Sequence, residues 1–262
     1  MSKFKPTKTQ KKMGNAFEKF RNKTGIGFTY NHGNKMCGMI SLSTACSCNE
    51  RCKANAKIPG SICSKCYAQQ YLKQRDNLET KLRTNGDVLK TEIIGVERWV
   101  HIDCRAWKIA RIEAFGDAEN VKVCINYCNL CKANPKIVFA AWTKNIDLWE
   151  AAFASEGKPD NLILIASAMM VNAPIDVRNH RCIDKVFTVY TAEWLIENGK
   201  TPYFINCGAR NCKKCKKCYT QTEEVEYVNE ILKSDVRKVQ KYWEAQGWTD
   251  LDTEHPHLIV NN

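Results

Sequence analysis

Four cysteines near the C-terminus have the spacing of ligands that share one metal centre. They are Cys207, Cys212, Cys215 and Cys218, in the pattern Cys-x4-Cys-x2-Cys-x2-Cys. Cysteines separated by two residues recur in the cluster-binding runs of bacterial ferredoxins, and the x4, x2 beginning matches the plant-type run. The four lysines between these cysteines would offset the negative charge of the thiolates. The spacing predicts an iron–sulfur cluster, with a structural zinc knuckle as the alternative.

A second set of cysteines lies in a loop-like stretch earlier in the chain. Five of them fall within residues 46–66, beside Pro59 and Gly60: Cys46, Cys48, Cys52, Cys63 and Cys66. Thiolates are soft ligands that select zinc or iron–sulfur clusters, and the spacing of Cys63 and Cys66 lets two sulfurs face one centre. We therefore predict a second metal site here, distinct from the first.

A third set, Cys124, Cys128 and Cys131, has the x3, x2 spacing of the cluster motif in radical S-adenosylmethionine enzymes. The same spacing also forms one stripe of an α-helix. At a rise of 1.5 Å per residue, the outer two would stand about 10 Å apart, too far for one small cluster. We predict that these three thiols face the core.

The composition favours metal ligation over disulfides. The chain has 262 residues, 44% of them hydrophobic, and an odd number of cysteines, 15. No apolar stretch follows the basic N-terminus, so we expect no secretory signal. The apolar run 162–171 is about half the ~20 residues of a membrane-spanning helix. A cytoplasmic protein without a membrane partner is expected, and reducing conditions there keep cysteines available to metals.

The charge balance suggests an anionic partner. The net charge is +12, from 40 Lys and Arg against 28 Asp and Glu. Nucleic acid is the usual partner of such a surface. Residues 1–24 carry eight Lys and Arg and one acidic residue, Glu18. This segment is predicted to be a flexible basic arm that contacts phosphate, or alternatively a solubilising tail.

Apolar segments of strand length alternate with helical segments along the middle of the chain. Strands are expected at 38–42, 111–115, 137–142, 162–168, 186–190 and 203–206. Helices are expected at 67–85, 88–109, 119–133 and 146–155, in a short segment before Gly199, and as one long charged helix over 223–246. The stop signals for two of them are Asn85–Gly86 and Asn134–Pro135.

This alternation predicts an α/β fold with about six parallel strands. A partial (β/α) barrel is the favoured architecture, and an open doubly wound sheet is the alternative. We divide the chain into a basic arm (1–24), a barrel-like domain (25–206), and a cysteine cluster with a C-terminal helix (207–262). Active sites of both architectures gather at the carboxyl ends of the strands, where the cysteine-rich loop and Cys207 also fall.

Four other residues at expected strand ends are candidates for chemistry. Gly116 permits close approach of a ligand, and Asp117 would bind a cofactor amine or cap the next helix. Thr143 and Lys144 would hold an anion, or act as a cap followed by a solvated lysine. We take Asp117 and Lys144 as candidate catalytic residues. Gly116, Asp117 and Thr143 are the candidate cofactor-binding residues.

Several short motifs, in this order, resemble a phage-associated family known as gene-product-88-like proteins. They are Cys63-Ser-Lys-Cys66-Tyr67-Ala68, Gly116–Asp117, Asn134–Pro135, Trp142–Thr143–Lys144–Asn145 and the C-terminal cysteine run. The resemblance spans roughly residues 38–218. It implies a phage-associated context rather than a particular reaction.

A more distant similarity is to radical S-adenosylmethionine enzymes, which place a cysteine loop after the first strand of a partial barrel. The similarity implies that Cys52, Cys63 and Cys66 ligate a 4Fe–4S cluster with one open iron. It also implies that Gly116 and Asp117 hold the amino group of S-adenosylmethionine. The C-terminal cysteines would correspond to an auxiliary cluster. The loop departs from the usual spacing and leaves Cys46 and Cys48 without a role in this scheme.

Two functions follow from these patterns. The first is an iron–sulfur enzyme with two clusters, a radical S-adenosylmethionine-like or related redox reaction, and an electron donor as partner. The second is a non-catalytic protein, stabilised by zinc or clusters, that binds nucleic acid through its basic surface.

Overall fold

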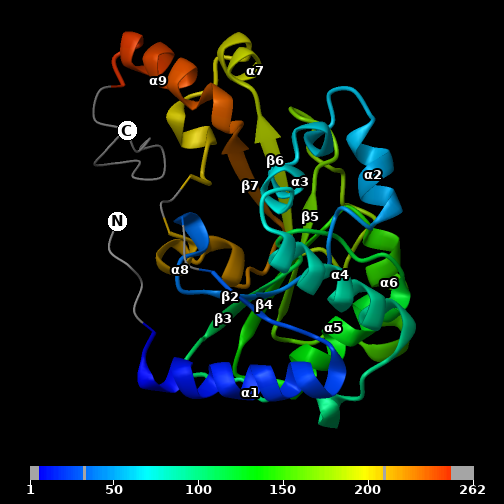
Figure 1. Ribbon diagram of the computed structural model, residues 1–262. Helices are drawn as coiled ribbons and strands as arrows, with labels where there is room; N and C mark the ends of the chain where they lie inside the picture. Colours follow the sequence, from blue (N-terminus) through cyan, green and yellow to red (C-terminus); the bar gives the residue numbers. More distant parts are fainter. Residues whose placement is uncertain (1–5, 32–33, 209–210, 249–262) are drawn as a thin grey trace.

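The strands form one sheet whose order follows the sequence. The computed structural model describes residues 6–31, 34–208 and 211–248, and in these residues seven strands pair in the order β1 to β7 (Figure 1). They are β1 Thr29–Tyr30, β2 Ile40–Leu42, β3 Ile109–Ile112, β4 Val138–Thr143, β5 Leu162–Ser167, β6 Lys185–Tyr190 and β7 Glu226–Ile231. β1 is antiparallel to β2, and every other neighbouring pair is parallel. The α/β class is thus confirmed.

Helices and short 3-10 turns connect the strands. The α-helices are α1 Lys8–Thr24, α2 Glu50–Ala56, α3 Tyr67–Leu72, α4 Asp76–Thr91, α5 Val121–Ala133, α6 Ile146–Glu156, α7 Ala192–Glu197, α8 Cys212–Cys215 and α9 Val236–Ala245. The 3-10 turns are η1 Asn34–Met36, η2 Ile62–Lys65, η3 Val96–Arg98, η4 Pro202–Phe204, η5 Lys217–Tyr219 and η6 Lys233–Asp235. Within the described residues, no helix is long and apolar enough to cross a membrane.

The two faces of the sheet have different coverings. On one face, Phe139 and Leu164 pack in a core with residues of α1, α5 and α6, helices that lie around the lower half of the view in Figure 1. On the other face, alternate residues such as Ala140 and Ile163 pack against Tyr219, with Cys212 and Cys218 beside it. Both faces of β5 are buried, as is typical of a parallel strand. The C-terminal cysteine segment therefore rests directly on the sheet.

The predicted basic arm is largely a packed helix. Thr7 and Gln10 form a capping box at the start of α1, and Gly25 ends the helix with a φ of 80°. Met13 and Phe20 are buried in the core, and the Phe17 ring stacks on Phe28 with centroids 4.6 Å apart. Apolar residues at positions 13, 17 and 20 form one helical stripe among the lysines. The prediction of flexibility is wrong for residues 8–24, and residues 1–5 lie outside the described residues.

Two predicted helix boundaries are wrong between β2 and β3. α4 continues through Asn85 and Gly86 to Thr91, and residues 92–108 contain only the short turn η3. The Asn85 side chain is buried and bonds both the N–H and the C=O of Gly27, as well as the C=O of Ser43. Asn85 therefore serves as a buried tie between loops, because its amide satisfies three backbone groups that would otherwise lack partners.

The C-terminal third also differs from the prediction. The strand expected at 203–206 is the turn η4, and the helix expected over 223–246 is divided into β7 and α9. β7 pairs with β6 along six residues, and Lys185 of β6 forms an ion pair with Glu226. The domain boundary placed at residue 207 falls within the β6–β7 crossover, so the cysteine segment is part of the main sheet's connections. Residues 249–262 of the predicted last domain lie outside the described residues.

Candidate metal centre

One cleft, with a volume of about 970 Å³, is lined by residues from both cysteine sets. It reaches the carboxyl ends of the parallel strands, where Glu113, Lys144 and Ser167 line it, and extends over one face of the sheet, where Arg111 and Trp142 line it. The first cysteine group comprises Cys46, Cys52, Cys63 and Cys66, and the second comprises Cys207, Cys212, Cys215 and Cys218. Cys48, predicted as a ligand, does not line the cleft and packs instead beside the cluster that contains Ala45.

Short capped segments position the first cysteine group. Cys46 follows β2, and its backbone N–H donates to the Phe115 carbonyl at 3.1 Å. Asn49 caps α2 by accepting from the Cys52 N–H, and its amide also donates to the Asp117 carbonyl. The loop before Cys63 is held over the end of β5 by a bridge between Ser61 and Met170. The loop is therefore held in place by backbone and side-chain contacts to the segments that follow β3 and β5.

The thiols of Cys46 and Cys66 act on each other. This interaction, helped by the backbone N–H groups of Gln69 and Ala68, lowers the pKa of Cys66 to about 6. The same interaction and burial raise the pKa of Cys46. Burial raises the pKa of Cys52 and of Cys63. The charge of Cys63 adds to the rise in Cys52, and the charge of Cys66 adds to the rise in Cys63. The thiolate is the metal-binding form, so Cys66 is prepared for ligation at neutral pH.

The second cysteine group is placed by β7 and by α8. The Cys207 N–H donates to the Asn229 carbonyl at 3.0 Å, which sets this cysteine beside β7. Asn211 caps α8, and Lys216 ends it with a φ of 57°. Burial raises the pKa of Cys207, Cys212 and Cys218, the last to about 12, and these thiols influence one another electrostatically. The helical turn thus gathers the cysteines on one side of the cleft.

The donor chemistry fits soft metal ions, although the thiols are not drawn together as a ligand shell. In the described ranges, no three His, Cys, Asp or Glu side chains converge at metal-ligand distances. Cysteines of both groups nevertheless line one cleft, and thiolates are the donors of zinc and iron–sulfur sites.

Comparison with known proteins gives no relative. No family model, curated protein or solved structure matches this chain. The functional argument therefore depends on the cleft and its residues.

Asp117 ties the end of β3 to the end of β4. Its Oδ1 accepts from the Thr143 hydroxyl at 2.8 Å and from the Ala118 N–H, and its Oδ2 accepts from the Lys144 N–H at 2.7 Å. Burial raises the pKa of Asp117 against these bonds. The N-cap of α5 is Asn120, so the alternative of Asp117 as that cap is wrong. Asp117 and Thr143 line the cleft, but their polar groups already have partners within the chain.

Gly116 makes room for Thr44. A Cβ at Gly116 would lie 2.5 Å from the Thr44 Oγ1 and 2.8 Å from its carbonyl oxygen. The space that the sequence analysis assigned to a ligand is therefore filled, in part, by Thr44. Lys144 does face the cleft, and its Nζ donates to the Ser167 hydroxyl at 3.1 Å.

Sequence reasoning missed Glu113, which follows β3 and lines the cleft. Its side chain is 2% exposed and its backbone has a φ of 54°, a strained value for a residue other than glycine. It accepts hydrogen bonds from the Tyr127 hydroxyl and from Thr44, and burial raises its pKa to about 7. A glutamate directly after an apolar strand is the only signal that the sequence contains for it.

The third cysteine set behaves as predicted. Cys124, Cys128 and Cys131 lie on α5, are fully buried and belong to the core. Burial raises the pKa of all three thiols. Their role as core residues is confirmed.

Proposed function

We propose that this chain is an iron–sulfur enzyme that holds two cysteine-ligated clusters, 4Fe–4S in type, in a single cleft. The observation that carries the proposal is that both cysteine groups line the same cleft, which runs from the carboxyl ends of the strands over one face of the sheet. Two purely structural metals would not need a shared cavity, since structural sites are closed. An open cleft between them gives room for a substrate.

The strand order supports a partial (β/α) barrel as the scaffold. Strands β2 to β7 are parallel and consecutive, and among the described strands the order never reverses as it does in a doubly wound sheet. Barrel enzymes place their reactive groups at the carboxyl ends of the strands. The first cysteine group follows β2, the first parallel strand, and an acidic residue, Glu113, follows the second. This order supports the proposed similarity to radical S-adenosylmethionine enzymes.

For the first site we propose Cys52, Cys63 and Cys66 as ligands. All three line the cleft and are partly exposed to it, whereas Cys46 is 2% exposed and packs with Leu72. Three cysteine ligands leave one iron open, which distinguishes a catalytic centre from a closed one. Cys207, Cys212, Cys215 and Cys218 are proposed as the four ligands of a closed second cluster.

The chain's own residues would control protons and charge around these sites. A cluster with an open iron supplies one-electron chemistry when S-adenosylmethionine or a related cofactor is bound. Glu113, with a pKa near neutrality, can hold or release a proton at the cleft wall. Lys144 offsets thiolate charge, because its ammonium group opposes the rise in the pKa of Cys63. Asp117 and Thr143 position Lys144 by fixing the turn that bears it.

Anaerobic purification tests the proposal. A brown protein with visible absorbance, iron and acid-labile sulfide is expected, and addition of S-adenosylmethionine after reduction should perturb the spectrum and yield 5′-deoxyadenosine. Iron and sulfide without a response to S-adenosylmethionine would support another redox enzyme or an electron-transfer protein. Zinc in place of iron would instead favour the metal-stabilised, nucleic-acid-binding alternative. The proposed setting is the reducing cytoplasm, where an electron donor can reach the protein.

A further inference from the structure

Arg111 has unused hydrogen-bond donors in the wall of the cleft. It extends from β3, and its guanidinium carbon lies 4.0 Å from the centre of the Trp142 ring on β4. A guanidinium group has five N–H donors in a planar fork. Within the described residues, its hydrogen bonding is limited to a weak contact of 3.7 Å from Nη1 to the Met36 sulfur, and its buried Nε has no partner.

Carboxylates do not balance the charge of this wall. Lys35 and Lys217 line the cleft and form ion pairs with Glu230 and Glu226. Six further cations line it, and none of them forms an ion pair within the described part of the chain: Arg51, Lys65, Arg111, Lys144, Lys216 and Lys233. Outside the cleft, arginines such as Arg105 and Arg178 do have carboxylate partners. The cleft therefore retains an excess of positive charge.

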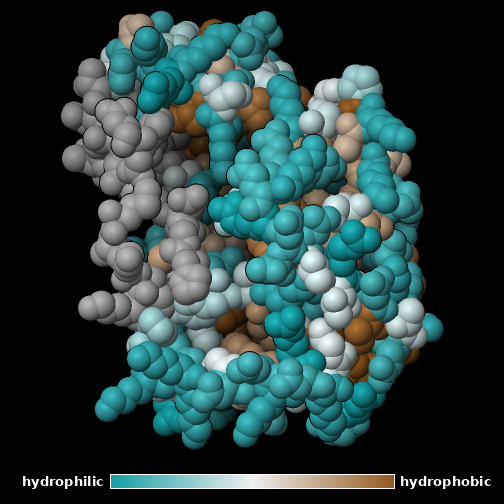
Figure 2. Space-filling model, in the orientation of Figure 1, coloured by the Kyte–Doolittle hydropathy of each residue, from teal (hydrophilic) through white to brown (hydrophobic). Residues whose placement is uncertain are grey.

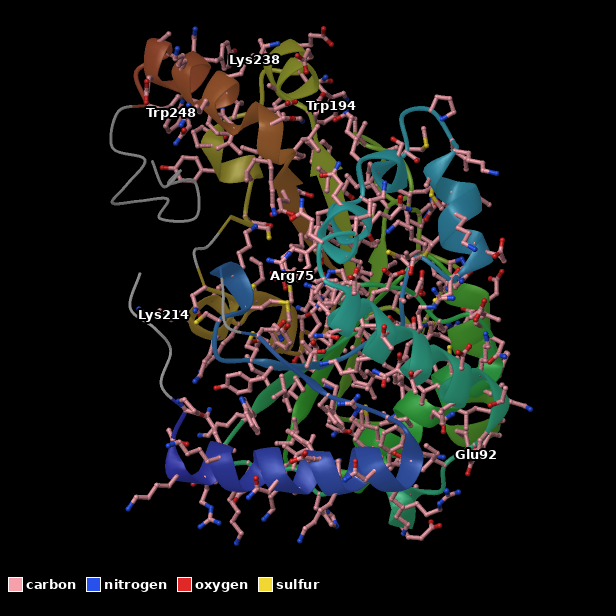
Figure 3. All side chains as sticks on the ribbon, viewed as in Figure 1. Arg75, Glu92, Trp194, Lys214, Lys238 and Trp248 are labelled. Carbon is pink, nitrogen blue, oxygen red and sulfur yellow. The ribbon has the colours of Figure 1, made fainter. Side chains whose placement is uncertain are left out.

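Two tyrosines that line the cleft, Tyr67 and Tyr71, also contact cations. Arg75 lies 3.6 Å over the ring of Tyr71, and Lys233 lies 5.4 Å over the ring of Tyr67. Figure 3 labels Arg75 beside α3 and Lys214 on α8, on the face of the molecule seen in Figure 1. Figure 2 shows the same face with hydrophilic side chains over α1 and over the segment of α3.

The hydrogen-bond donors of Arg111 are not engaged by the thiols of the second group. Its charge opposes the rise in pKa that burial gives Cys212 and Cys218, so it lies close enough to stabilise their thiolates. That effect acts through the electrostatic field, and no hydrogen bond joins Arg111 to a cysteine in the described residues. Trp142 holds the planar group in one orientation, which leaves the fork ready for a planar or tetrahedral oxyanion.

We propose that Arg111 binds an oxyanion group, a phosphate or a carboxylate, on the substrate of this cleft, with Trp142 fixing the guanidinium. The assignment of the anion to a substrate rests on the proposed function, whereas the anion site itself does not. The substrate would enter between the two cysteine groups with its anionic end at β3. Arg111 is then a binding residue that selects anionic molecules over neutral ones.

Protection of Arg111 from phenylglyoxal, mapped by mass spectrometry, tests the site. Inorganic phosphate and acetate are the probes, with chloride at equal ionic strength as the control. Arg178, an exposed arginine paired with Asp176, is the internal reference. Protection of Arg111 by phosphate alone would identify a phosphoryl group, protection by acetate a carboxylate, and Arg178 should react equally throughout. Failure of both anions to protect Arg111 would overturn the proposal.

Variants give an independent measurement. By calorimetry, Arg111→Lys should weaken binding of the protecting anion by about tenfold or more, because one ammonium replaces the bidentate fork. Arg111→Gln should abolish binding, and Arg178→Gln should leave it unchanged. Equal binding by Arg111→Lys, Arg111→Gln and the natural chain would contradict the site, provided that their circular dichroism shows the same fold.

Metal-free and metal-loaded protein separate this inference from the proposed function. If the protein takes up no cluster, the proposed function fails, while protection in the metal-free protein still supports the anion site. If cluster loading alone shields Arg111 and neither anion adds protection, the guanidinium serves the cluster. That result would overturn the anion site and leave the two-cluster proposal standing.

Discussion

Tyr127 and Glu113 meet at the end of β3, where the phenol of Tyr127 donates a 2.5 Å hydrogen bond to Oε1 of Glu113. Thr44 adds two more hydrogen bonds, from its hydroxyl and from its backbone N–H. These three donors favour the ionised carboxylate, yet burial outweighs them and raises the pKa to about 7 from the ordinary 4.5. The carboxyl group thus titrates near neutral pH at the edge of the cleft.

This shift predicts a pH dependence of stability. Between the ordinary pKa of 4.5 and the folded value of about 7, the folded state holds a proton that the unfolded state has lost. The free energy of unfolding should therefore fall as the pH rises through this window, by roughly 3 kcal/mol. In Glu113→Gln the part of this fall that Glu113 contributes should be absent, so the dependence on pH should be weaker. Chemical denaturation at several pH values measures it.

The exposed glutamate at the end of α7 supplies the control for that experiment. Glu197→Gln should retain the pH dependence of the natural chain, since this side chain lies at the surface. If Glu113→Gln and Glu197→Gln showed the same slope against pH, Glu113 would not be the titrating group.

The first cysteine group should hold one site's share of the metal. A Cys63→Ala, Cys66→Ala double variant is expected to lose about half of the bound iron, because two thiolates of one centre are removed. Cys48→Ala is the matched control, since this cysteine belongs to the same loop but does not line the cleft. Elemental analysis of the purified proteins gives the result. If the double variant and Cys48→Ala lost equal amounts of iron, a position in the lining of the cleft would not distinguish metal ligands from other cysteines.

The second cysteine group should behave independently. Cys212→Ala combined with Cys218→Ala is expected to remove the other half of the iron. Cys128→Ala serves as a contrast, because that fully buried thiol lies on α5 in the core. It should lower the free energy of unfolding by roughly 1–2 kcal/mol through the cavity it leaves, with no change in iron content. Loss of iron from Cys128→Ala would place a ligand in the core instead.

Gly116 provides a test of the close contact at the strand ends. In Gly116→Ala the new Cβ would meet the Thr44 Oγ1 at 2.5 Å and the Thr44 carbonyl at 2.8 Å, so the two loops must separate. The expected destabilisation is about 1–3 kcal/mol. Gly14→Ala, in the middle of α1 with no atom within 4 Å of the new Cβ, should instead stabilise by up to about 1 kcal/mol. Thermal unfolding of the two variants distinguishes these outcomes.

The parts of the fold that could be predicted are those in which one pattern dominates. The strands β4 and β5 are continuous apolar runs, and α5 ends at Asn134–Pro135, so the sequence signals there agree with the structure. The errors arose where a tertiary contact outweighs the local signal. Asn85 resembles a helix-end residue, but its buried side chain donates hydrogen bonds to the carbonyls of Gly27 and Ser43 in the middle of α4.

β7 illustrates the same limit. It reads as part of a charged helix because its glutamates, Glu226 and Glu230, stand four residues apart as on one face of a helix. In the structure Glu226 instead pairs with the buried Lys185. The local signal also misleads at α1. The lysines on its exposed face outnumber the apolar residues of the buried stripe that includes Phe20, so the segment resembles a solvated arm.

For the candidate site, spacing identified the cysteines but could not show that they share a cleft. Two cysteine sets about 150 residues apart come together only through the sheet, because the first set follows the end of β2 and the second rests on one face of the same sheet. Single charged residues in or directly after a strand, such as Arg111 and Glu113, have no spacing partner in the sequence. Their importance depends on burial and on missing or strained contacts, which only the structure supplies.

Electron paramagnetic resonance of the reduced protein tests most directly whether two clusters share the cleft. The account predicts a signal broadened or split by magnetic interaction between two neighbouring paramagnetic clusters. This interaction should be lost in Cys63→Ala, Cys66→Ala and equally in Cys212→Ala, Cys218→Ala, each of which retains one cluster with a simple signal. A spectrum of the natural chain equal to the sum of the two variant spectra, or one with no iron–sulfur signal, would contradict the account.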